Sequence, residues 1–146
     1  MSVQKSLMLG ALLFGLAAGA AQALEPVNPQ PAMPLTFEHP AYQKVTPEVA
    51  RQMIEDGVVV LDVRNPVERL KEGYIAGSYN VSLQALKPGA RLAFAPDLDQ
   101  KILVHCRSGV RAEQAAKILV QTGYRHVYNM YGTLQWPYGL VNGKEN

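Results

Sequence analysis

Hydrophobic residues recur along the chain in two spacings. Apolar runs at residues 58–63 and 102–105 are nearly continuous, which is typical of strands that are covered on both faces of a sheet. Residues 79–83 and 127–129 are weaker strand candidates. Between these runs, apolar residues recur every three or four positions, as they do on one side of a helix. Alternating strands and helices predict an α/β domain with a parallel sheet and helices on both faces.

Capping residues mark where the predicted helices begin and end. Thr46 is a good N-cap, and Pro47 stands at the first helical position. Asn65 and Pro66 repeat this arrangement, and Glu68 completes a capping-box pattern. A third helix is expected from about residue 110 to residue 121, and a short one over residues 133–136. The glycines expected to end the first three helices are Gly57, Gly73 and Gly123.

The first 23 residues have the pattern of a secretory signal peptide. Lys5 supplies one positive charge, residues 7–20 are almost wholly apolar, and Ala21-Gln22-Ala23 has the small-residue form of a cleavage site. The apolar run is shorter than the roughly 20 residues that a membrane-spanning helix needs. We therefore expect export to the periplasm with cleavage after Ala23. The open alternative is an uncleaved segment that tethers the protein to the membrane.

Residues 24–41 are a proline-rich leader between this segment and the domain, which we place at residues 42–141. Proline fixes φ and lacks an N–H donor, so no regular helix or strand is expected in the leader. It is either an extended tether or a segment that lies against the domain through Leu35 and Phe37. Its prolines are Pro26, Pro29, Pro31, Pro34 and Pro40.

Composition and charge narrow the class of protein. The chain has 146 residues, of which 48% are hydrophobic and 18% are charged, as expected for one globular domain. A net charge of +2 without a basic run gives no sign of nucleic-acid binding. The single cysteine excludes an internal disulfide. It also excludes a dithiol redox mechanism, because that mechanism needs a second, resolving cysteine.

The segment after the strand at residues 102–105 carries the candidate chemistry. Cys106 lies where that strand ends, and ligands of parallel sheets bind beyond the carboxyl ends of strands. The helix that follows provides free backbone N–H groups and a dipole, and both favour an anion. In this setting the thiol should ionise readily, so Cys106 is the candidate nucleophile. The loop expected to bind the anionic substrate consists of Arg107, Ser108, Gly109, Val110 and Arg111.

Two other chemistries fit parts of this segment. The spacing of Cys106 and Arg111 is similar to that of a cysteine-dependent phosphatase signature, but that signature has five intervening residues where this chain has four. The shorter loop makes a tighter ring of N–H groups, which favours sulfur over a tetrahedral phosphoryl group as the attacked centre. A metal site is not expected, because His39, His105 and His126 lack ligand spacing.

These residues resemble the rhodanese family of single-domain sulfurtransferases. Residues 106–111 are similar to the family's active-site loop, residues 61–64 with Glu68 to its early strand and turn, residues 73–81 to its second signature, and residues 123–136 to its closing segment. Three positions depart from the family. Tyr74 replaces a common His and Ala76 a common Pro, which should alter packing, and Tyr131 replaces the first of two glycines, which should alter substrate access.

The resemblance implies a five-stranded parallel sheet flanked by helices, with neither a metal nor an organic cofactor. It also implies that Cys106 takes the outer sulfur of an anionic donor such as thiosulfate and carries it as a persulfide. A thiophilic acceptor (cyanide, a thiol or a protein) then removes the sulfur. Arg107 and Arg111 would attract the donor and offset negative charge. The alternative for Arg111 is a pair with an acid such as Glu113.

Asp62 and Arg64 are expected to support the site from the end of a neighbouring strand. Asp62 would accept hydrogen bonds from loop N–H groups or pair with an arginine, and Arg64 would frame the entrance. Neither is needed as a general base, because a thiolate has already lost its proton.

A different class of function stays open beside the enzyme. A persulfide on Cys106 would equally serve a carrier module that hands sulfur to a partner protein and turns over slowly alone. A cysteine-dependent phosphatase is the less favoured alternative.

Overall fold

The computed structural model describes residues 34–143 of the chain. The predicted signal peptide and residues 24–33 of the leader lie outside the described residues. Among the residues that are described, no helix is both long and apolar enough to cross a membrane.

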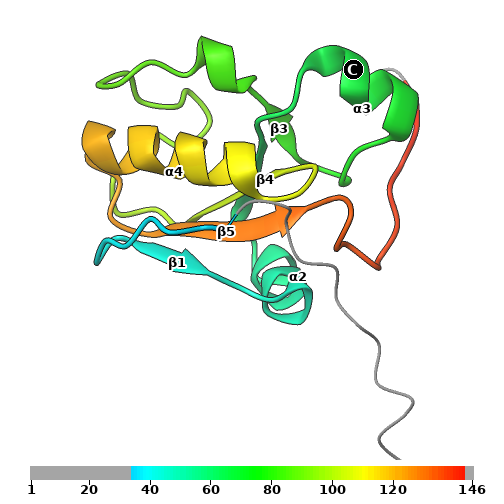
Figure 1. Cartoon of the computed structure of the whole chain (residues 1–146), viewed down its shortest axis with the longest axis horizontal. Coiled ribbons are helices and arrows are strands. Elements are labelled where there is room, and N and C mark those ends of the chain that lie inside the picture. Colours follow the sequence, from blue (N-terminus) through cyan, green and yellow to red (C-terminus); the bar gives the residue numbers. More distant parts are fainter. Residues whose placement is uncertain (1–33, 144–146) are drawn as a thin grey trace, which may run out of the picture.

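Five parallel strands form one sheet in the middle of the domain (Figure 1). Their order across the sheet is β1-β5-β4-β2-β3. The α/β class and the five-stranded parallel sheet expected from the sequence are therefore confirmed. The strands are β1 (Tyr42–Lys44), β2 (Val59–Asp62), β3 (Tyr79–Asn80), β4 (Ile102–Cys106) and β5 (Val127–Gly132).

The helices begin at the predicted caps. The hydroxyl of Thr46 accepts the N–H of Val49 at 3.3 Å, and the N–H of Asn65 donates to the carboxylate of Glu68 at 2.8 Å. Because these bonds satisfy N–H groups that a helix leaves free, they fix where each helix starts. The helices are α2 (Pro47–Glu55), α3 (Pro66–Glu72) and α4 (Val110–Thr122), and a 3₁₀ turn, η2, spans Leu83–Ala85.

Two predicted elements differ in the structure. The strand expected at residues 79–83 ends at Asn80, because the chain enters η2 at Leu83. The prediction of a helix at residues 133–136 is wrong, because this segment forms turns. The N–H groups of Thr133 and Leu134 donate to the carbonyls of Cys106 and Arg107, so they are held by the loop after β4.

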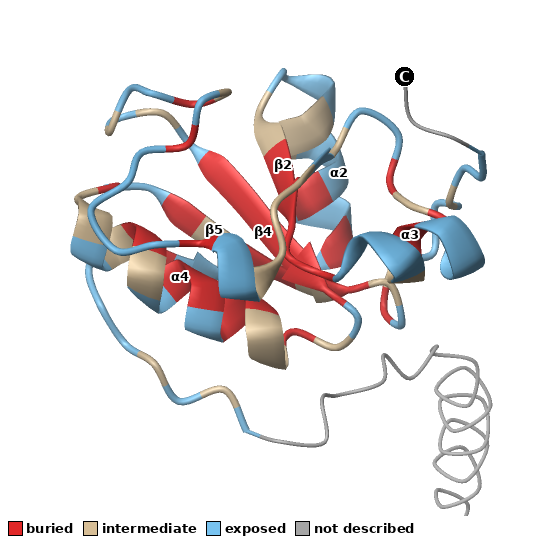
Figure 2. Cartoon of the chain, turned by 90° about the horizontal axis from the view of Figure 1, so that it is seen from above, coloured by how far each residue is buried: buried red, intermediate tan, exposed pale blue. Residues whose placement is uncertain are grey.

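Helices cover both faces of the sheet, and each face has its own hydrophobic core. In Figure 1, α4 lies on one side of the sheet and α2 on the other. Side chains alternate along β4, so Ile102 and Val104 join the core under α4, and Leu103 joins the core under α2. Both β2 and β4 are almost wholly buried (Figure 2). Burial of each such aliphatic side chain contributes about 1.5–3 kcal/mol.

The described part of the leader, residues 34–41, packs on the domain beside α4. The N–H groups of Thr36 and Phe37 donate to the carboxylate of Glu113 at 3.2 and 3.0 Å. The ring of Phe37 lies 5.0 Å from that of Tyr42, centroid to centroid. The sequence left open whether the leader is an extended tether or lies against the domain. Residues 34–41 lie against the domain.

Candidate active site

Cys106 is the last residue of β4, and only three residues separate it from the start of α4 at Val110. Its side chain is 1% exposed. The N–H of Gly109 donates to the sulfur of Cys106 at 3.0 Å. Gly109 has a φ of 112°, a conformation that a side chain disfavours. This backbone geometry brings an N–H group to the sulfur, where the N–H can stabilise negative charge during a reaction.

The other residues of the loop differ in exposure and contacts. The side chain of Arg107 is 54% exposed, and its Nε lies 3.8 Å from the carboxylate of Glu72. The carbonyl of Ser108 accepts a hydrogen bond from the side-chain amide of Gln135 at 3.3 Å. Val110 is half-buried at the first position of α4. Within the loop, Arg107 is thus the cation that faces the solvent.

The end of β5 supports this loop through its backbone. The N–H groups of Thr133 and Leu134 donate to the carbonyls of Cys106 and Arg107 at 3.1 and 3.0 Å. Gly132 approaches the loop so closely that an added Cβ would overlap the carbonyl group of Arg107. The glycine at this position therefore permits contacts that a side chain would prevent.

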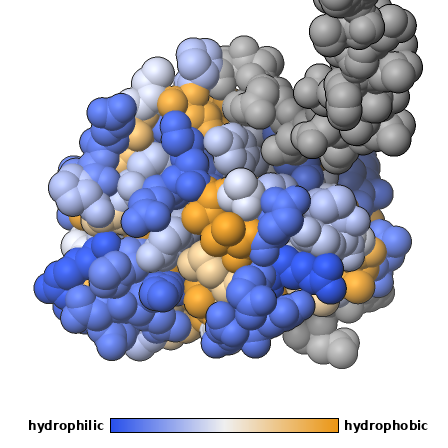
Figure 3. All heavy atoms as spheres, turned by 90° about the horizontal axis from the view of Figure 1, so that it is seen from below, coloured by the Kyte–Doolittle hydropathy of each residue, from blue (hydrophilic) through white to orange (hydrophobic). Residues whose placement is uncertain are grey.

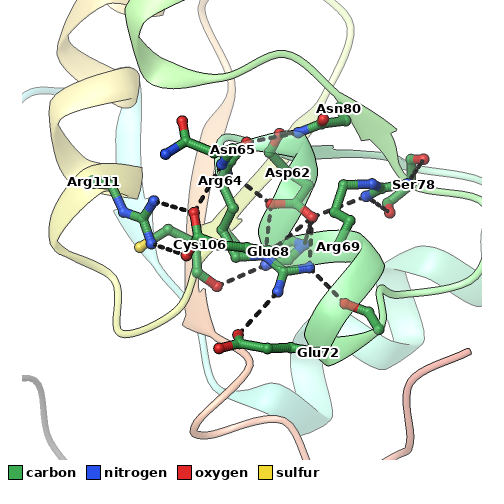
Figure 4. A network of polar contacts seen from close by, with 12 residues as sticks. Asp62, Arg64, Asn65, Glu68, Arg69, Glu72, Ser78, Asn80, Cys106 and Arg111 are labelled. Carbon is green, nitrogen blue, oxygen red and sulfur yellow. Dashed lines mark hydrogen bonds and ion pairs between the residues drawn. The ribbon is translucent and has the colours of Figure 1, made fainter. Parts of the chain in front are cut away.

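Arg111 reaches across to α3 and forms a bidentate ion pair (Figure 4). Its two terminal nitrogens lie 2.7 and 2.8 Å from the carboxylate of Glu68. The hydrogen bonds from Arg111 hold the pKa of Glu68 below its ordinary value. The same bonds raise the pKa of Arg111, and the charge of Cys106 adds to this effect. The alternative expected for Arg111, a pair with an acid, is therefore observed, but the acid is Glu68. Glu113, the example given, accepts N–H groups of the leader instead.

Asp62 is fully buried between two arginines (Figure 4). Arg64 donates to it through Nε at 3.0 Å and through Nη2 at 2.8 Å. Arg69 donates through Nη1 at 2.9 Å. Asp62 also accepts the backbone N–H of Arg64, in the loop after β2, at 3.0 Å. Both roles that the sequence allowed for Asp62 are therefore observed.

Arg64 does not frame the entrance, so that expectation is wrong. Its side chain is fully buried, and its Nη2 also donates to the carbonyl of Gly73 at 2.9 Å. The remaining nitrogen, Nη1, lies 3.6 Å from the carboxylate of Glu72. Arg64 turns inward because the buried carboxylate of Asp62 needs a compensating charge.

His105 on β4 is fully buried, and its ring lies beside the carboxylate of Asp62. Its Nδ1 is 3.0 Å from the carbonyl of Cys106, and its Nε2 is 3.8 Å from Asp62. Burial lowers the pKa of His105, so the ring is neutral. Burial alone would raise the pKa of Asp62, but the hydrogen bonds from Arg64 and Arg69 hold it below the ordinary value.

Sequence reasoning missed three polar side chains that the fold brings to this region, namely Tyr42, Arg69 and Asn129. Asn129 lies on β5, where its amide donates to the carbonyl of Gly109 at 3.1 Å. The available signal was an amide in the middle of a strand that is otherwise apolar or aromatic. Glu68 was expected as a cap and as part of the family's early turn, but not as the partner of Arg111.

A hollow of about 240 Å³ lies elsewhere, between α2 and the residues after β5. Its lining includes Ile54, Ile75 and Trp136. Figure 3, which views the molecule from the side of α2, shows hydrophobic residues gathered among hydrophilic ones. Neither Cys106 nor its loop lines the hollow, so it is separate from the candidate active site.

Residues 34–143 hold no group of three or more His, Cys, Asp or Glu side chains arranged to bind a metal ion. The chemistry available at the loop is that of one thiol, the N–H of Gly109 and the charges of Arg107 and Arg111. A buried sulfur that accepts an N–H at the start of a helix suits nucleophilic attack on an anion.

Known proteins are similar to this chain in sequence and in fold. Residues 46–136 match the rhodanese-like domain. The thiosulfate sulfurtransferase GlpE of Pseudomonas aeruginosa (strain LESB58) is 34% identical over 91 residues, which cover 62% of this chain and 79% of the relative. A solved structure, "rhodanese with anions from E. coli", is 32% identical with a TM-score of 0.52, covering 60% of this chain and 100% of the other. A rhodanese-related protein from Thermoplasma volcanium is 30% identical with a TM-score of 0.57, covering 68% and 98%.

The fold and the loop define an α/β protein with a cysteine at the carboxyl edge of a parallel sheet. The chain belongs to the family of rhodanese-like domains. Its similarity to thiosulfate sulfurtransferases places it among the sulfurtransferase enzymes.

Proposed function

We propose that the protein moves sulfane sulfur from an anionic donor such as thiosulfate to a thiophilic acceptor through a persulfide on Cys106. The observation that carries this proposal is the hydrogen bond from Gly109 to the sulfur of Cys106 at 3.0 Å. It lies at the start of α4, where the helix dipole and free N–H groups also favour negative charge. The name of the relative from Pseudomonas aeruginosa supports thiosulfate as the donor.

In the first half-reaction the thiolate of Cys106 attacks the outer sulfur of thiosulfate. A sulfur–sulfur bond forms at Cys106, the sulfur–sulfur bond of the donor breaks, and sulfite leaves with the electron pair. In the second half-reaction an acceptor nucleophile attacks the terminal sulfur of the persulfide, and Cys106 returns as a thiolate. Neither half-reaction requires a general base at Cys106, because Cys106 attacks as a thiolate in the first and leaves as a thiolate in the second.

The loop's charges have different parts in this scheme. Arg107 faces the solvent and attracts the incoming anion. Arg111 is engaged by Glu68, so the donor competes with that carboxylate for its guanidinium. The N–H of Gly109 stabilises the negative charge on Cys106 before the thiolate attacks the donor and again after the acceptor has removed the sulfur.

The test is intact-mass analysis of the full chain after treatment with thiosulfate. The wild-type protein should gain one sulfur atom and lose it again when cyanide is added, with formation of thiocyanate. Cys106→Ser should do neither. Because Cys106 is the single cysteine of the chain, a gain of sulfur in Cys106→Ser would overturn the assignment of the nucleophile.

A protein acceptor is the second candidate, in which the domain acts as a persulfide carrier. The observation that favours it is Leu134, which is 52% exposed although its N–H is bonded to Arg107 of the loop. An apolar side chain beside the loop suits contact with another protein. If the domain is a carrier, the transfer of sulfur from Cys106 to cyanide should be much slower than its transfer to the thiol of a protein acceptor. Equal rates would argue for the enzyme acting alone.

The proposal includes export to the periplasm, with cleavage after Ala23. It is supported by the apolar run at residues 7–20 and by the small residues before the cleavage position. Mass spectrometry of the protein from the periplasmic fraction should find Leu24 at the N-terminus. Retention of Met1 in a membrane fraction would instead indicate a tether.

A further inference from the structure

A buried polar network connects the Cys106 loop with two segments that are distant in sequence, and the proposed reaction does not use it. Its centre is Asn129 on β5, which is fully buried. The Nδ2 of Asn129 donates to the carbonyl of Gly109 and to the hydroxyl of Tyr42, each at 3.1 Å. Its Oδ1 accepts the N–H of Tyr131 at 2.8 Å. All three contacts of the amide are therefore made within the protein.

Tyr42 and Glu113 continue this network away from the loop. The hydroxyl of Tyr42 donates to the carboxylate of Glu113 at 3.3 Å. Glu113 also accepts the N–H groups of Thr36 and Phe37, which belong to the packed part of the leader. Burial raises the pKa of Tyr42 above its ordinary value, and the charge of Glu113 adds to this effect. The hydroxyl thus keeps its proton and directs it to Glu113.

Tyr42, the carbonyl of Gly109 and the N–H of Tyr131 together fix the orientation of the Asn129 amide. Since the hydroxyl proton of Tyr42 is already directed to Glu113, the Tyr42 oxygen can only accept from Asn129. If the amide were reversed, its oxygen would face the carbonyl of Gly109, and the N–H of Tyr131 would lose its acceptor. A buried N–H or carbonyl that loses its hydrogen-bond partner destabilises the folded state. Only the observed orientation satisfies all of these groups.

Gly109 is the point at which the network reaches the chemistry. Its N–H donates to the sulfur of Cys106 at 3.0 Å. Its carbonyl accepts from Asn129 at 3.1 Å and from the N–H of Glu113 at 3.0 Å. As a glycine with a φ of 112°, it has few steric limits of its own on rotation. The bonds to its carbonyl therefore limit how far its N–H can turn away from the sulfur.

We propose that Asn129 is a positioning residue for the Cys106 loop, held in its working orientation by Tyr42. Asn129 acts through Gly109 and does not touch the substrate. This inference rests on the proposed role of Cys106 as the nucleophile. It assigns to β1 and β5 a part in the reactivity of the thiol, in addition to their part in the sheet.

The test compares Asn129→Leu and Tyr42→Phe in the full chain. The rate of alkylation of Cys106 by iodoacetamide is measured across pH, and the single cysteine makes the signal specific. With Gly109 less constrained, its N–H stabilises the thiolate less, so the midpoint of the pH profile should rise. We expect a rise of about half a pH unit or more in Asn129→Leu, and a smaller rise in Tyr42→Phe, which retains the amide.

Tyr124→Phe is the matched control. Tyr124 is also a buried tyrosine, and its hydroxyl donates to the carbonyl of Ala95 at 2.6 Å and accepts the N–H of Leu92 at 2.8 Å. Its removal should lower the free energy of unfolding about as much as Tyr42→Phe does, because each loses one buried hydroxyl with two hydrogen bonds. The midpoint for Cys106 should not change in this control.

Unchanged midpoints in both Asn129→Leu and Tyr42→Phe would overturn the proposal and leave the network a purely structural role. An equal rise in Tyr124→Phe would overturn it as well, since general loosening would then explain the effect. A rise in Asn129→Leu alone would overturn the role of Tyr42. If Asn129→Leu shows no cooperative unfolding, the midpoint measured for Tyr42→Phe alone decides whether the proposal stands. Alkylation needs no sulfur donor, so failure here is distinct from failure of the wild-type protein to gain sulfur from thiosulfate.

Discussion

At the scale of single residues, two glycines shape the surroundings of Cys106 in different ways. Gly109 adopts a φ of 112° and so directs its N–H to the sulfur. Gly132 leaves space for the carbonyl of Arg107. Between Asn129 and Gly132, Tyr131 has a φ of 68°, which costs a non-glycine residue about 1–2 kcal/mol. Members of the family that the sequence resembles commonly have glycine where this chain has Tyr131. The left-handed backbone at this position explains that preference, because glycine adopts a positive φ without strain.

Gly132→Ala should displace the loop and strongly reduce sulfur transfer. The added methyl group overlaps the carbonyl of Arg107, and overpacking of this kind lowers the free energy of unfolding by about 1–3 kcal/mol. Thiocyanate formation and urea unfolding measure the two effects. Gly77→Ala is the control, because Gly77 has a φ of 80° but no atom within 4 Å of an added Cβ. It should lose some stability and keep its activity. Wild-type turnover in Gly132→Ala would show that the close approach of β5 does not shape the loop.

At the scale of elements, α3 and α4 meet in the ion pair between Glu68 and Arg111. Glu68 has two partners, since it caps α3 through the N–H of Asn65 and binds the guanidinium of Arg111. The pair is partly exposed, with 21% and 31% of the two side chains accessible. Its contribution to stability is therefore small, about 1 kcal/mol or less. Its larger effect is to offset one positive charge near Cys106.

Glu68→Gln should lower the KM for thiosulfate by a few-fold, because Arg111 is then free to attract the anion. The variant should lose about 1 kcal/mol of stability or less. Steady-state thiocyanate formation measures the KM. Arg111→Ala should raise it. The control is Glu55→Gln, which removes an exposed pair with Arg51 on α2, where the nitrogen and oxygen are 3.3 Å apart. The same KM in Glu68→Gln and Glu55→Gln would contradict a role of the Glu68 charge in donor binding.

At the scale of the whole molecule, a charged centre is enclosed at the carboxyl end of the sheet. Asp62, Arg64 and Arg69 are buried together, with the neutral ring of His105 beside them. Removal of one partner would leave an unpaired buried charge, which commonly costs about 3–5 kcal/mol. This centre joins β2, α3 and β4, so it links the strand of the nucleophile to the helix that binds Arg111.

The stability of the folded protein should fall as the pH is lowered from 6.5. Burial lowers the pKa of His105 from its ordinary value of 6.5, so below that pH the unfolded chain binds a proton that the folded protein does not. The free energy of unfolding then decreases by at most about 1.4 kcal/mol per pH unit. Below the ordinary values of 4.5 for Glu68 and 3.8 for Asp62, the lowered pKa values of these carboxylates add further losses in the same direction.

Urea unfolding at several pH values between about 7.5 and 3 measures this dependence. His105→Leu should remove the slope between pH 6.5 and 5 and leave the losses at lower pH. An equal slope in the wild-type protein and in His105→Leu would show that another group causes it.

Local patterns accounted for most of the elements. Runs of apolar residues located β2 and β4, and caps such as Thr46 and Asn65 located the starts of α2 and α3. The pattern missed β1, because only Tyr42 of its three residues is buried. It also predicted a helix at residues 133–136, because hydrophobic spacing does not reveal that backbone donors are taken by a distant loop.

The sequence by itself determined the order of strands and helices, the family resemblance and the candidate thiol with its loop, because each depends on residues that are close in the chain. Only the tertiary structure decided the partners of the charged and polar groups. Arg111 meets Glu68 across 43 positions, and Asn129 meets Gly109 across 20. Such pairs depend on how helices pack on a sheet. Many acids could serve Arg111 in the sequence, and packing places one of them within hydrogen-bond distance.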